Sequence, residues 1–247
     1  LRIIMISILA GLTGLATSVP TLAAQELVQF DSGNAPFMDA SSGTTPAGFY
    51  PALFAEAFKR MGVEVHFAAV PWRRALQDID SARAGIGGIY QNSERLRKFD
   101  FSQPCHEERI AVYTLVGTKI VFTGISDLFG KSVGVINGWS YGDAFDTAVK
   151  AGKIKADPVA DDRSNMKKLA AGRVDAVLAI VESGDAALEN LNLEQSVQRG
   201  SVLFSISKVY LAFNKKANKL ALLAQFDRAI AEMRKDGSFD RLVATHF

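Results

Sequence analysis

The chain has 247 residues, of which 48% are hydrophobic and 22% are charged, and its formal net charge is +2. This composition excludes collagen-like, low-complexity and disulfide-scaffold proteins, and the small charge argues against a surface built to bind nucleic acid. One cysteine and three widely separated histidines, without CxxC or HExxH spacing, supply little for a metal site. We therefore expect a globular protein with no nucleic-acid partner, no metal and no other cofactor.

The first 24 residues have the layout of a secretory signal peptide. Arg2 precedes an apolar run from Ile3 to Ala16, and small residues close the segment at Ala23 and Ala24. The run is shorter than the roughly 20 residues of a membrane-spanning helix. A buried N-terminal helix or an uncleaved anchor is the alternative. We expect residues 1–24 to be removed on export, with no lipid anchor because no cysteine follows the run.

Strand and helix patterns alternate along the rest of the chain, which is typical of an α/β sheet with mostly parallel strands. In chain order, the predicted elements are a strand at 26–30, a Gly/Pro/Ser-rich stretch at 31–48, a helix at 50–61, a strand at 63–70, a helix at 72–82, a strand at 84–90, a strand at 131–136, a helix from Tyr141, a helix near 165–171, a strand at 174–180 and a helix at 218–235.

Two extended, β-rich stretches, 110–116 and 202–213, bracket the second half of this pattern. If both cross between two lobes, the C-terminal helix returns to complete the first lobe. The chain then divides into lobe 1 at 25–112, lobe 2 at 113–207 and a return segment at 208–247. Two lobes joined by two crossings form a cleft that opens and closes about a hinge.

The segment from Asn92 to Pro104 (NSERLRKFDFSQP) holds the strongest candidate for ligand chemistry. It follows the strand at 84–90, so Arg95 lies near the carboxyl end of a strand, where open α/β sheets bind ligands. A guanidinium binds a carboxylate through two hydrogen bonds and stays charged at any working pH. The alternative is an ordinary solvated basic stretch formed by Arg95, Arg97 and Lys98.

Two further segments suit ligand binding. Ser140 and Asp143 have the spacing of a capping box at a helix start, where free N–H groups favour an anion, so Ser140 is a cap, a ligand-binding residue or both. The run from Gly85 to Gly88 lacks the Lys-Ser/Thr that completes a phosphate-binding loop. Within a strand, such a run indicates close approach of the backbone to a ligand.

Taken together, these segments resemble the periplasmic solute-binding proteins of polar amino-acid ABC transporters, the extracellular solute-binding protein family 3. The matching pieces, which follow the family's order through nearly all of the chain after residue 24, are DSGNAPF at 31–37, GF at 48–49, VPW at 70–72, the segment at 93–104, LFGKSVGV at 128–135, GWS at 138–140, GRVDA at 172–176 and DGSFDRLVATHF at 236–247.

The resemblance implies a two-lobed α/β periplasmic binding-protein fold of type II, whose two crossover strands form the hinge. It also implies a periplasmic monomer that captures a small carboxylate-bearing solute, a polar amino acid or a close relative, and delivers it to the membrane permease of an ABC transporter. No catalytic residue is expected.

The resemblance assigns roles to individual residues. Arg95 matches the arginine that binds the ligand carboxylate, and Ser140 falls where the family places a hydroxyl on the same carboxylate. Asp31 matches an acidic residue that lines the cleft, and Trp72 takes the aromatic wall position unless it is an ordinary core residue. The other residues expected at the ligand are Asn34, Gly88, Tyr90 and Glu182.

Departures from the family pattern concern the ligand's amine. The aspartate that binds an α-ammonium falls at Ile180, and the nearest acid is Glu182. Either Glu182 takes over this role or the ligand has no α-ammonium. Gly88 and Tyr90 stand where a hydroxyl or a small polar side chain is common. Cys105 replaces an aromatic residue and is expected to be a small buried apolar side chain.

Two other functions compete. Cyclohexadienyl dehydratases resemble these binding proteins, and their chemistry needs a general acid over the leaving hydroxyl. Asp185 and Glu182 are the nearest acids, but the sequence shows no nucleophile–base pair. A sensory module usually needs a membrane helix or a signalling domain in the same chain. We therefore expect a binding protein and not an enzyme.

Overall fold

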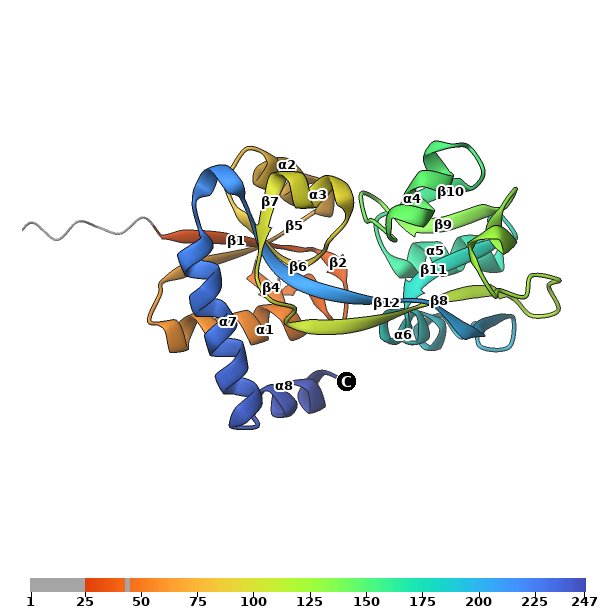
Figure 1. Cartoon of the computed structure of the whole chain (residues 1–247). Coiled ribbons are helices and arrows are strands. Elements are labelled where there is room, and N and C mark those ends of the chain that lie inside the picture. The colour runs from red at the N-terminus through yellow and green to blue at the C-terminus, as the bar shows by residue number, and fades with distance from the viewer. Residues whose placement is uncertain (1–24, 43–44) are drawn as a thin grey trace, which may run out of the picture.

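The computed structural model describes residues 25–42 and 45–247, so the expected signal peptide at 1–24 lies outside the described residues. Two α/β lobes lie side by side along one continuous sheet (Figure 1). The first lobe consists of β1 (Glu26–Asp31), β2 (Gly33–Asn34), β3 (Met38–Ser42), β4 (Thr45–Ala47), α1 (Phe49–Met61), β5 (Val65–Val70), α2 (Trp72–Asp80), β6 (Gly85–Tyr90), α3 (Ser93–Lys98), β7 (Phe99–Phe101), α7 (Leu220–Lys235) and α8 (Ser238–His246). The second lobe consists of a 3-10 helix (Ile125–Leu128), β9 (Ser132–Ile136), α4 (Asp143–Lys150), β10 (Lys155–Val159), α5 (Asp162–Ala170), β11 (Ala176–Ile180) and α6 (Val181–Leu191).

The main sheet has the strand order β10-β9-β11-β8-β12-β6-β1-β5, with β7 also paired to β12. Strands β1, β5 and β6 are parallel in one lobe, and β9, β10 and β11 are parallel in the other. Their carboxyl ends therefore lie at the edges where the two lobes face each other, and Asp31 ends β1 while Tyr90 ends β6. The predicted two-lobed α/β fold is confirmed, although the sheet is mixed, because β8 and β12 pair antiparallel with their neighbours.

Two long antiparallel strands join the lobes, β8 (His106–Leu115) and β12 (Val197–Asn214). They pair with each other from His106 opposite Val209 to Leu115 opposite Val197, with irregular register on either side of Leu203. The extended stretches expected at 110–116 and 202–213 coincide with these strands. A short 3-10 helix (Lys215–Ala217) then leads from β12 back into the first lobe.

The C-terminal helix α7 packs on α1. The ring of Phe226 lies 4.8 Å from the ring of Phe54 and 6.0 Å from that of Phe58, measured between centroids. Helix α8 follows, and its Phe239 lies against Phe49. The apolar residues spaced along α1 and α7 therefore form the faces through which the two helices pack on each other.

Gly85 and Gly87 in β6 are explained by core packing and not, as expected, by close approach to a ligand. A Cβ atom on Gly85 would overlap the ring of Phe213, and one on Gly87 would overlap the rings of Phe30 and Phe54. All six residues of β6 are buried. The glycines therefore make room for aromatic core side chains, and the expectation that the run approaches a ligand is wrong for Gly85 and Gly87.

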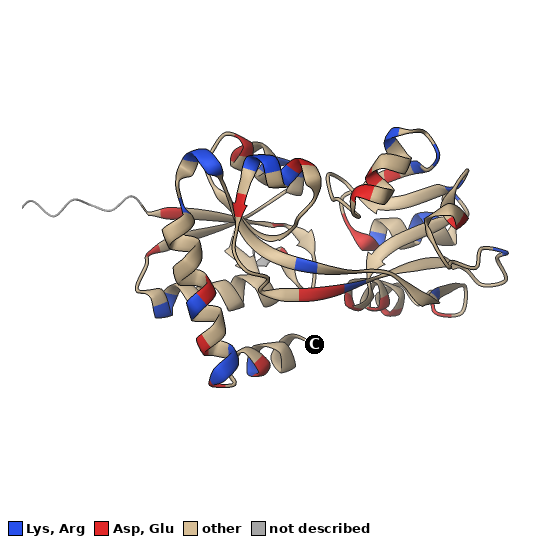
Figure 2. Ribbon diagram, in the orientation of Figure 1, with Lys and Arg blue, Asp and Glu red and all other residues tan. Residues whose placement is uncertain are grey.

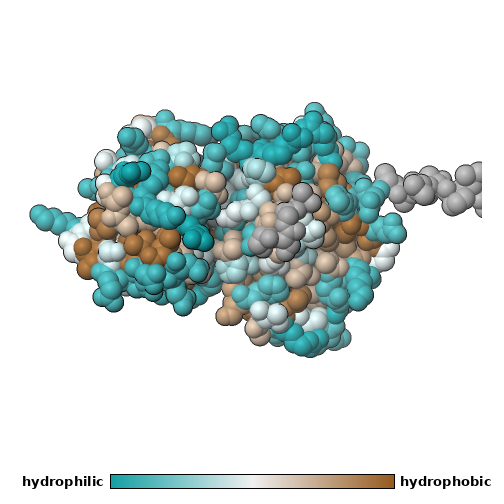
Figure 3. All heavy atoms as spheres, turned by 180° about the vertical axis from the view of Figure 1, so that it is seen from behind, coloured by the Kyte–Doolittle hydropathy of each residue, from teal (hydrophilic) through white to brown (hydrophobic). Residues whose placement is uncertain are grey.

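Other differences are local. The stretch at 31–48 is not a plain loop, because β2, β3 and β4 form a small separate sheet there. Cys105 is fully buried and free, as expected. Among the residues that the structure describes, no helix is long and apolar enough to cross a membrane. Figure 3 shows one face of the molecule, on which hydrophilic residues surround separate hydrophobic patches on both lobes.

Candidate functional site

Arg95 lies at the start of α3, directly after β6, and its guanidinium is buried between the lobes. Only 8% of the residue is exposed. Asn92 caps α3 by accepting a hydrogen bond from the Arg95 amide, which fixes the backbone. The guanidinium donates to the Tyr90 carbonyl at 2.8 Å and, across the cleft, to the Gly138 carbonyl at 3.3 Å.

The charge of Arg95 is not neutralised by an acid. Within the described ranges, no carboxylate lies within 4 Å of its guanidinium nitrogens. Burial lowers the pKa of Arg95 to about 10, while the negative charge of Asp146 acts in the opposite direction. The side chain remains cationic at neutral pH. Its hydrogen-bond acceptors are two backbone carbonyl oxygens, and no anion pairs with it. Such a group is suited to accept a carboxylate.

Ser140 lies opposite Arg95, in the loop after β9, and its hydroxyl joins the two lobes. The hydroxyl accepts a hydrogen bond from the side-chain amide of Asn92 at 3.0 Å and donates one to the Asp146 carboxylate at 2.5 Å. The capping box expected from Ser140 and Asp143 is wrong. Helix α4 begins at Asp143 with Gly142 as its N-cap, and Asp143 instead bonds the amide and hydroxyl of Ser93 in the first lobe.

Trp139 is a site residue that the sequence interpretation did not single out. Its indole Nε1 donates to Asp31 Oδ2 at 3.1 Å, and its ring lies 6.3 Å from that of Trp72 and 6.0 Å from that of Tyr90. Trp72 is buried and donates from its own indole to the Gly138 carbonyl at 3.2 Å. Two tryptophans from opposite lobes thus meet in the cleft.

These aromatic side chains fill the space in front of Arg95. The cavity that remains is about 10 Å³ and is lined by Trp72, Gly88, Tyr90, Arg95, Trp139 and Ser140. That is roughly the space of one water molecule. A solute therefore enters this small cavity only when Trp139 moves or the lobes separate.

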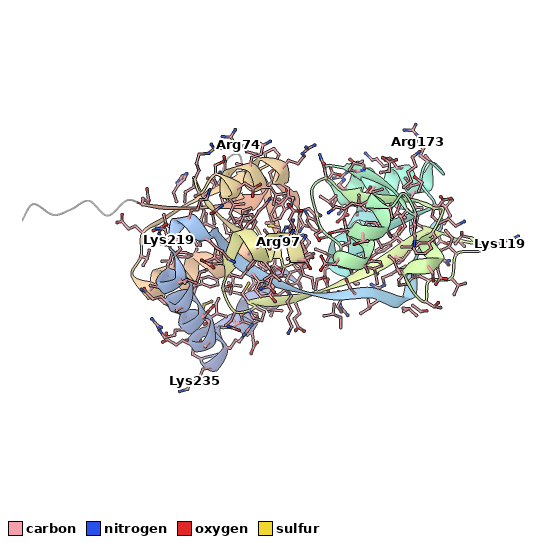
Figure 4. The ribbon with its side chains drawn as sticks, turned by 45° about the horizontal axis from the view of Figure 1, so that its top comes forward. Arg74, Arg97, Lys119, Arg173, Lys219 and Lys235 are labelled. Atoms are coloured by element: carbon pink, nitrogen blue, oxygen red, sulfur yellow. The ribbon has the colours of Figure 1, made fainter. Side chains whose placement is uncertain are left out.

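A larger groove leads from this place to the surface. It has a volume of about 700 Å³ and runs between α3 of the first lobe and α4 of the second, with Arg95, Asn92 and Ser140 in its wall. Basic residues mark α3 and acidic residues mark the start of α4 (Figure 2). Arg97, which also lines the groove, lies on α3 next to the second lobe (Figure 4).

Asp31 and Asn34 occupy the other side of the cleft. Asp31 is 3% exposed, and burial raises its pKa to about 6 despite hydrogen bonds from Trp139 and the backbone. Asn34 accepts a hydrogen bond from Ser183 of α6 at 3.1 Å, which is a further contact between the lobes. Both expected residues therefore lie where the lobes meet.

Glu182 lies away from the Arg95 cavity. Its carboxylate binds Arg109 of strand β8 at 2.6 Å, so it already has a cationic partner beside the crossover strands. Ile180, the last residue of β11, is fully buried. Glu182 is thus not brought together with Arg95, Asp31 and Trp72.

Glu108 is a second residue that the sequence interpretation missed. It is 3% exposed in β8, and the hydroxyls of Tyr50 and Tyr90 both donate to its carboxylate. Burial raises the pKa of Glu108 to about 7, while these two hydrogen bonds act in the opposite direction. The sequence did contain an indication that Glu108 is buried. Residues two apart on a strand face the same side, and Ile110 and Val112 face the core. Tyr90 is thereby held at the edge of the cavity.

Gly88 lines the Arg95 cavity with a positive φ of 82°. A Cβ atom there would lie 2.8 Å from the Met38 side chain, so a larger residue would strain the backbone and the packing together. Among the described residues, no group of three or more His, Cys, Asp or Glu side chains is arranged to hold a metal ion.

Comparison with known proteins matches this architecture to one family. The sequence model for "Bacterial extracellular solute-binding proteins, family 3" matches residues 27–247. The L-cystine-binding protein TcyJ of Escherichia coli strain K12 is 28% identical over 218 residues, which cover 87% of this chain and 80% of that protein. The lysine/arginine/ornithine-binding periplasmic protein of the same strain is 25% identical over 254 residues, covering 99% and 96%.

Solved structures agree. An ancestral arginine-binding protein bound to arginine superposes with a TM-score of 0.77 at 25% identity, covering 91% of this chain and 99% of that one. A histidine kinase sensor domain with similarity to periplasmic binding proteins has a TM-score of 0.78 at 21% identity, covering 91% and 96%. The second likeness shows the fold alone, which is that of type II periplasmic binding proteins.

Proposed function

Because this chain belongs to the bacterial extracellular solute-binding proteins of family 3, we propose that it captures an amino acid or a close relative by its carboxylate, between the two lobes, for an ABC uptake system. Arg95 carries this proposal. A buried guanidinium without an acidic partner, reached from both lobes, suits an incoming carboxylate. The curated relatives bind cystine and basic amino acids, as their names state.

The contacts around Arg95 also explain how solute binding would close the two lobes. The Gly138 carbonyl and the Ser140 hydroxyl come from the second lobe, while Arg95, Asn92 and Trp72 come from the first. A carboxylate on Arg95 would replace a weak 3.3 Å bond to Gly138 with a charged pair that both lobes enclose. Binding energy is then available to hold the lobes together.

The proposal extends to the cell. Residues 1–24 direct export, the remaining chain acts as a monomer in the periplasm, and the closed form docks on the membrane permease. No observation favours the dehydratase alternative. The two acids nearest the required place are already paired, Glu182 with Arg109 and Asp185 with Arg199.

The test is a thermal-shift screen of residues 25–247 against L-arginine, L-lysine, L-ornithine, L-cystine, L-glutamine, glutarate and prephenate, followed by calorimetry on each hit. A ligand at 100 times its Kd adds about 2.7 kcal/mol of stability. Arg95→Gln should weaken binding of the hit at least about 30-fold, since it leaves a buried carboxylate without its charged partner. Arg97→Gln, on the same helix but exposed, is the matched control.

Equal affinity of Arg95→Gln and the unmodified chain for the hit would contradict the carboxylate site. If none of the probes shifts the melting temperature, an amino-acid solute is contradicted as well. Turnover of prephenate would replace the binding function with the dehydratase.

A further inference from the structure

Glu108 is a buried carboxylate on β8, a strand that joins the two lobes. It lies between the exposed residues Glu107 and Arg109, and only 3% of it is exposed. Within residues 25–42 and 45–247, no lysine, arginine or histidine forms an ion pair with it. The fold therefore buries this acid without a cation beside it.

Stability alone does not explain a carboxylate at this place. The charges that act on Glu108 from α5 and α6 belong to Asp162 and Glu182, and because both are acids they raise its pKa further. Burying an unpaired charge is costly, whereas an apolar side chain would fill the same core position without that cost. The contacts of the carboxylate must therefore account for its presence.

Two tyrosine hydroxyls share the carboxylate of Glu108. Tyr50 of α1 donates to Oε1, and Tyr90 of β6 donates to Oε2. The two bonds are chemically alike and both rings are buried, but the surroundings of the rings differ. Tyr50 packs among aromatic rings of the first lobe, such as Phe37 and Phe54, whereas Tyr90 lines the Arg95 cavity.

Tyr90 connects the buried carboxylate to the candidate site. Its backbone carbonyl accepts a hydrogen bond from Arg95 Nη1 at 2.8 Å, and its ring lies 6.0 Å from that of Trp139. The hydroxyl end of Tyr90 is thus bonded to β8, while its carbonyl is bonded to the guanidinium. Two hydrogen bonds through one residue join Glu108 to Arg95.

The residue next to Glu108 contacts the other lobe. Glu108 stands opposite Ser207 of β12, and the Arg109 side chain donates to Glu182 of α6 at 2.6 Å. One short stretch of β8 therefore bonds the edge of the Arg95 cavity through one residue and the second lobe through the next.

We propose that Glu108 is a positioning residue of the solute site. By holding the Tyr90 hydroxyl, it fixes the carbonyl that orients the Arg95 guanidinium for a carboxylate. This inference rests on the proposed function, since it assigns to Glu108 a share of the affinity for that carboxylate. Glu108 lines neither the cavity nor the groove, so it acts through Tyr90 and not on the solute. A donor that is oriented beforehand loses less freedom on binding, and a loosened Tyr90 should therefore weaken affinity.

The experiment compares Tyr90→Phe with the matched control Tyr50→Phe. Each variant removes one hydroxyl from the same carboxylate and keeps the aromatic ring. Glu108→Leu and the double variant with Tyr90→Phe complete a mutant cycle. Calorimetry at pH 8, where Glu108 with its pKa of about 7 is ionised, measures the affinity for L-arginine, L-lysine, L-cystine and glutarate. Thermal melting of each variant without solute measures its stability.

Tyr90→Phe should weaken binding of each probe that the unmodified chain binds by about 5- to 20-fold, a part of the value of a hydrogen bond to a charged group. Tyr50→Phe should lower the melting temperature but change the affinity less than about twofold, because its ring lies outside the cavity wall. The double variant should bind within about twofold of Tyr90→Phe alone, since both changes break one path.

Four outcomes would overturn the inference. If Tyr90→Phe and Glu108→Leu bind as tightly as the unmodified chain while Arg95→Gln does not, the carboxylate site stands and the positioning role is lost. Equal losses of affinity in Tyr90→Phe and Tyr50→Phe would make the network a purely structural one. Fully additive losses in the double variant would contradict a path through Tyr90. If no probe binds the unmodified chain, the proposed function fails together with this inference.

Discussion

The indole Nε1 of Trp139 donates a hydrogen bond to Asp31 Oδ2 at 3.1 Å, and the two residues belong to opposite lobes. The same indole lies against Trp72 and Tyr90, so it occupies the space between Arg95 and Asp31. The two lobes are therefore joined by contacts that, under the proposed function, a solute would replace. The side chain of Trp139 fills part of the cleft.

This relationship gives an optical signal. The chain has two tryptophans, Trp72 and Trp139, and both lie in the cleft. Addition of a solute that stabilises the chain should change the fluorescence emission, because the indole of Trp139 must leave Asp31. Trp139→Phe should remove most of the change and Trp72→Phe should retain it. Equal changes in both variants would contradict the displacement of Trp139.

The outer contact between the lobes should matter less than Arg95. Asp143 of α4 bonds the amide and hydroxyl of Ser93, and both residues are exposed. Exposed polar contacts contribute little, so Asp143→Ala should weaken solute binding less than about fivefold. Stopped-flow measurements should place this loss in faster release and not in slower association. A loss as large as that of Arg95→Gln would contradict this ranking.

Asp162 predicts a pH dependence of stability. Its pKa is raised by burial from 3.8 to about 7, so the folded state binds more protons than the unfolded state between these values. The contribution of Asp162 to the free energy of unfolding must then fall as pH rises from about 4 to about 7 and level off above. Relative to the unmodified chain, Asp162→Asn should gain melting temperature over that range. A difference that stays constant from pH 4.5 to 8 would contradict the raised pKa.

Tyr50 offers a test of the buried acid in β8. Its hydroxyl donates to Glu108, whose pKa of about 7 leaves the carboxylate ionised at pH 8. Tyr50→Phe should lower the free energy of unfolding at pH 8 by about 1–3 kcal/mol, because a buried charge loses a donor. Urea denaturation measures this. Tyr210→Phe is the control, since within the described residues the Tyr210 hydroxyl forms no hydrogen bond, and it should cost under about 0.5 kcal/mol.

Local periodicity was enough to predict much of the fold. The apolar spacing of α1 and α7 marks helices that pack on each other, and the uninterrupted β6 is buried on both faces. Helix α6 gave no comparable signal because Gly184 interrupts its pattern. A Cβ atom at that position would overlap the Tyr113 ring, so a contact distant in sequence requires glycine there. The strands β2 to β4 are too short for alternation to show.

The site was predictable only in part for the same reason. Arg95 follows from its place after a strand and from the family resemblance, and the structure puts it between the lobes. The place of Trp139 in the site depends on a contact between residues more than 100 positions apart, its hydrogen bond to Asp31. The spacing of Ser140 and Asp143 predicted a helix cap, whereas the partners of the Ser140 hydroxyl are Asp146 and, from the opposite lobe, Asn92.

The paired strands β8 and β12 constrain how far each part of the cleft travels. Since they are bonded to each other through the crossing, we expect any relative motion of the lobes to bend this ribbon, most easily at the irregular register around Leu203. Contacts beside the ribbon, such as Arg109 with Glu182, then shift little, whereas the distant pair of Ser93 and Asp143 sweeps the longest arc. If the lobes separate about this ribbon, the groove by α3 and α4 opens widest, and we expect it to be the entrance for the proposed solute.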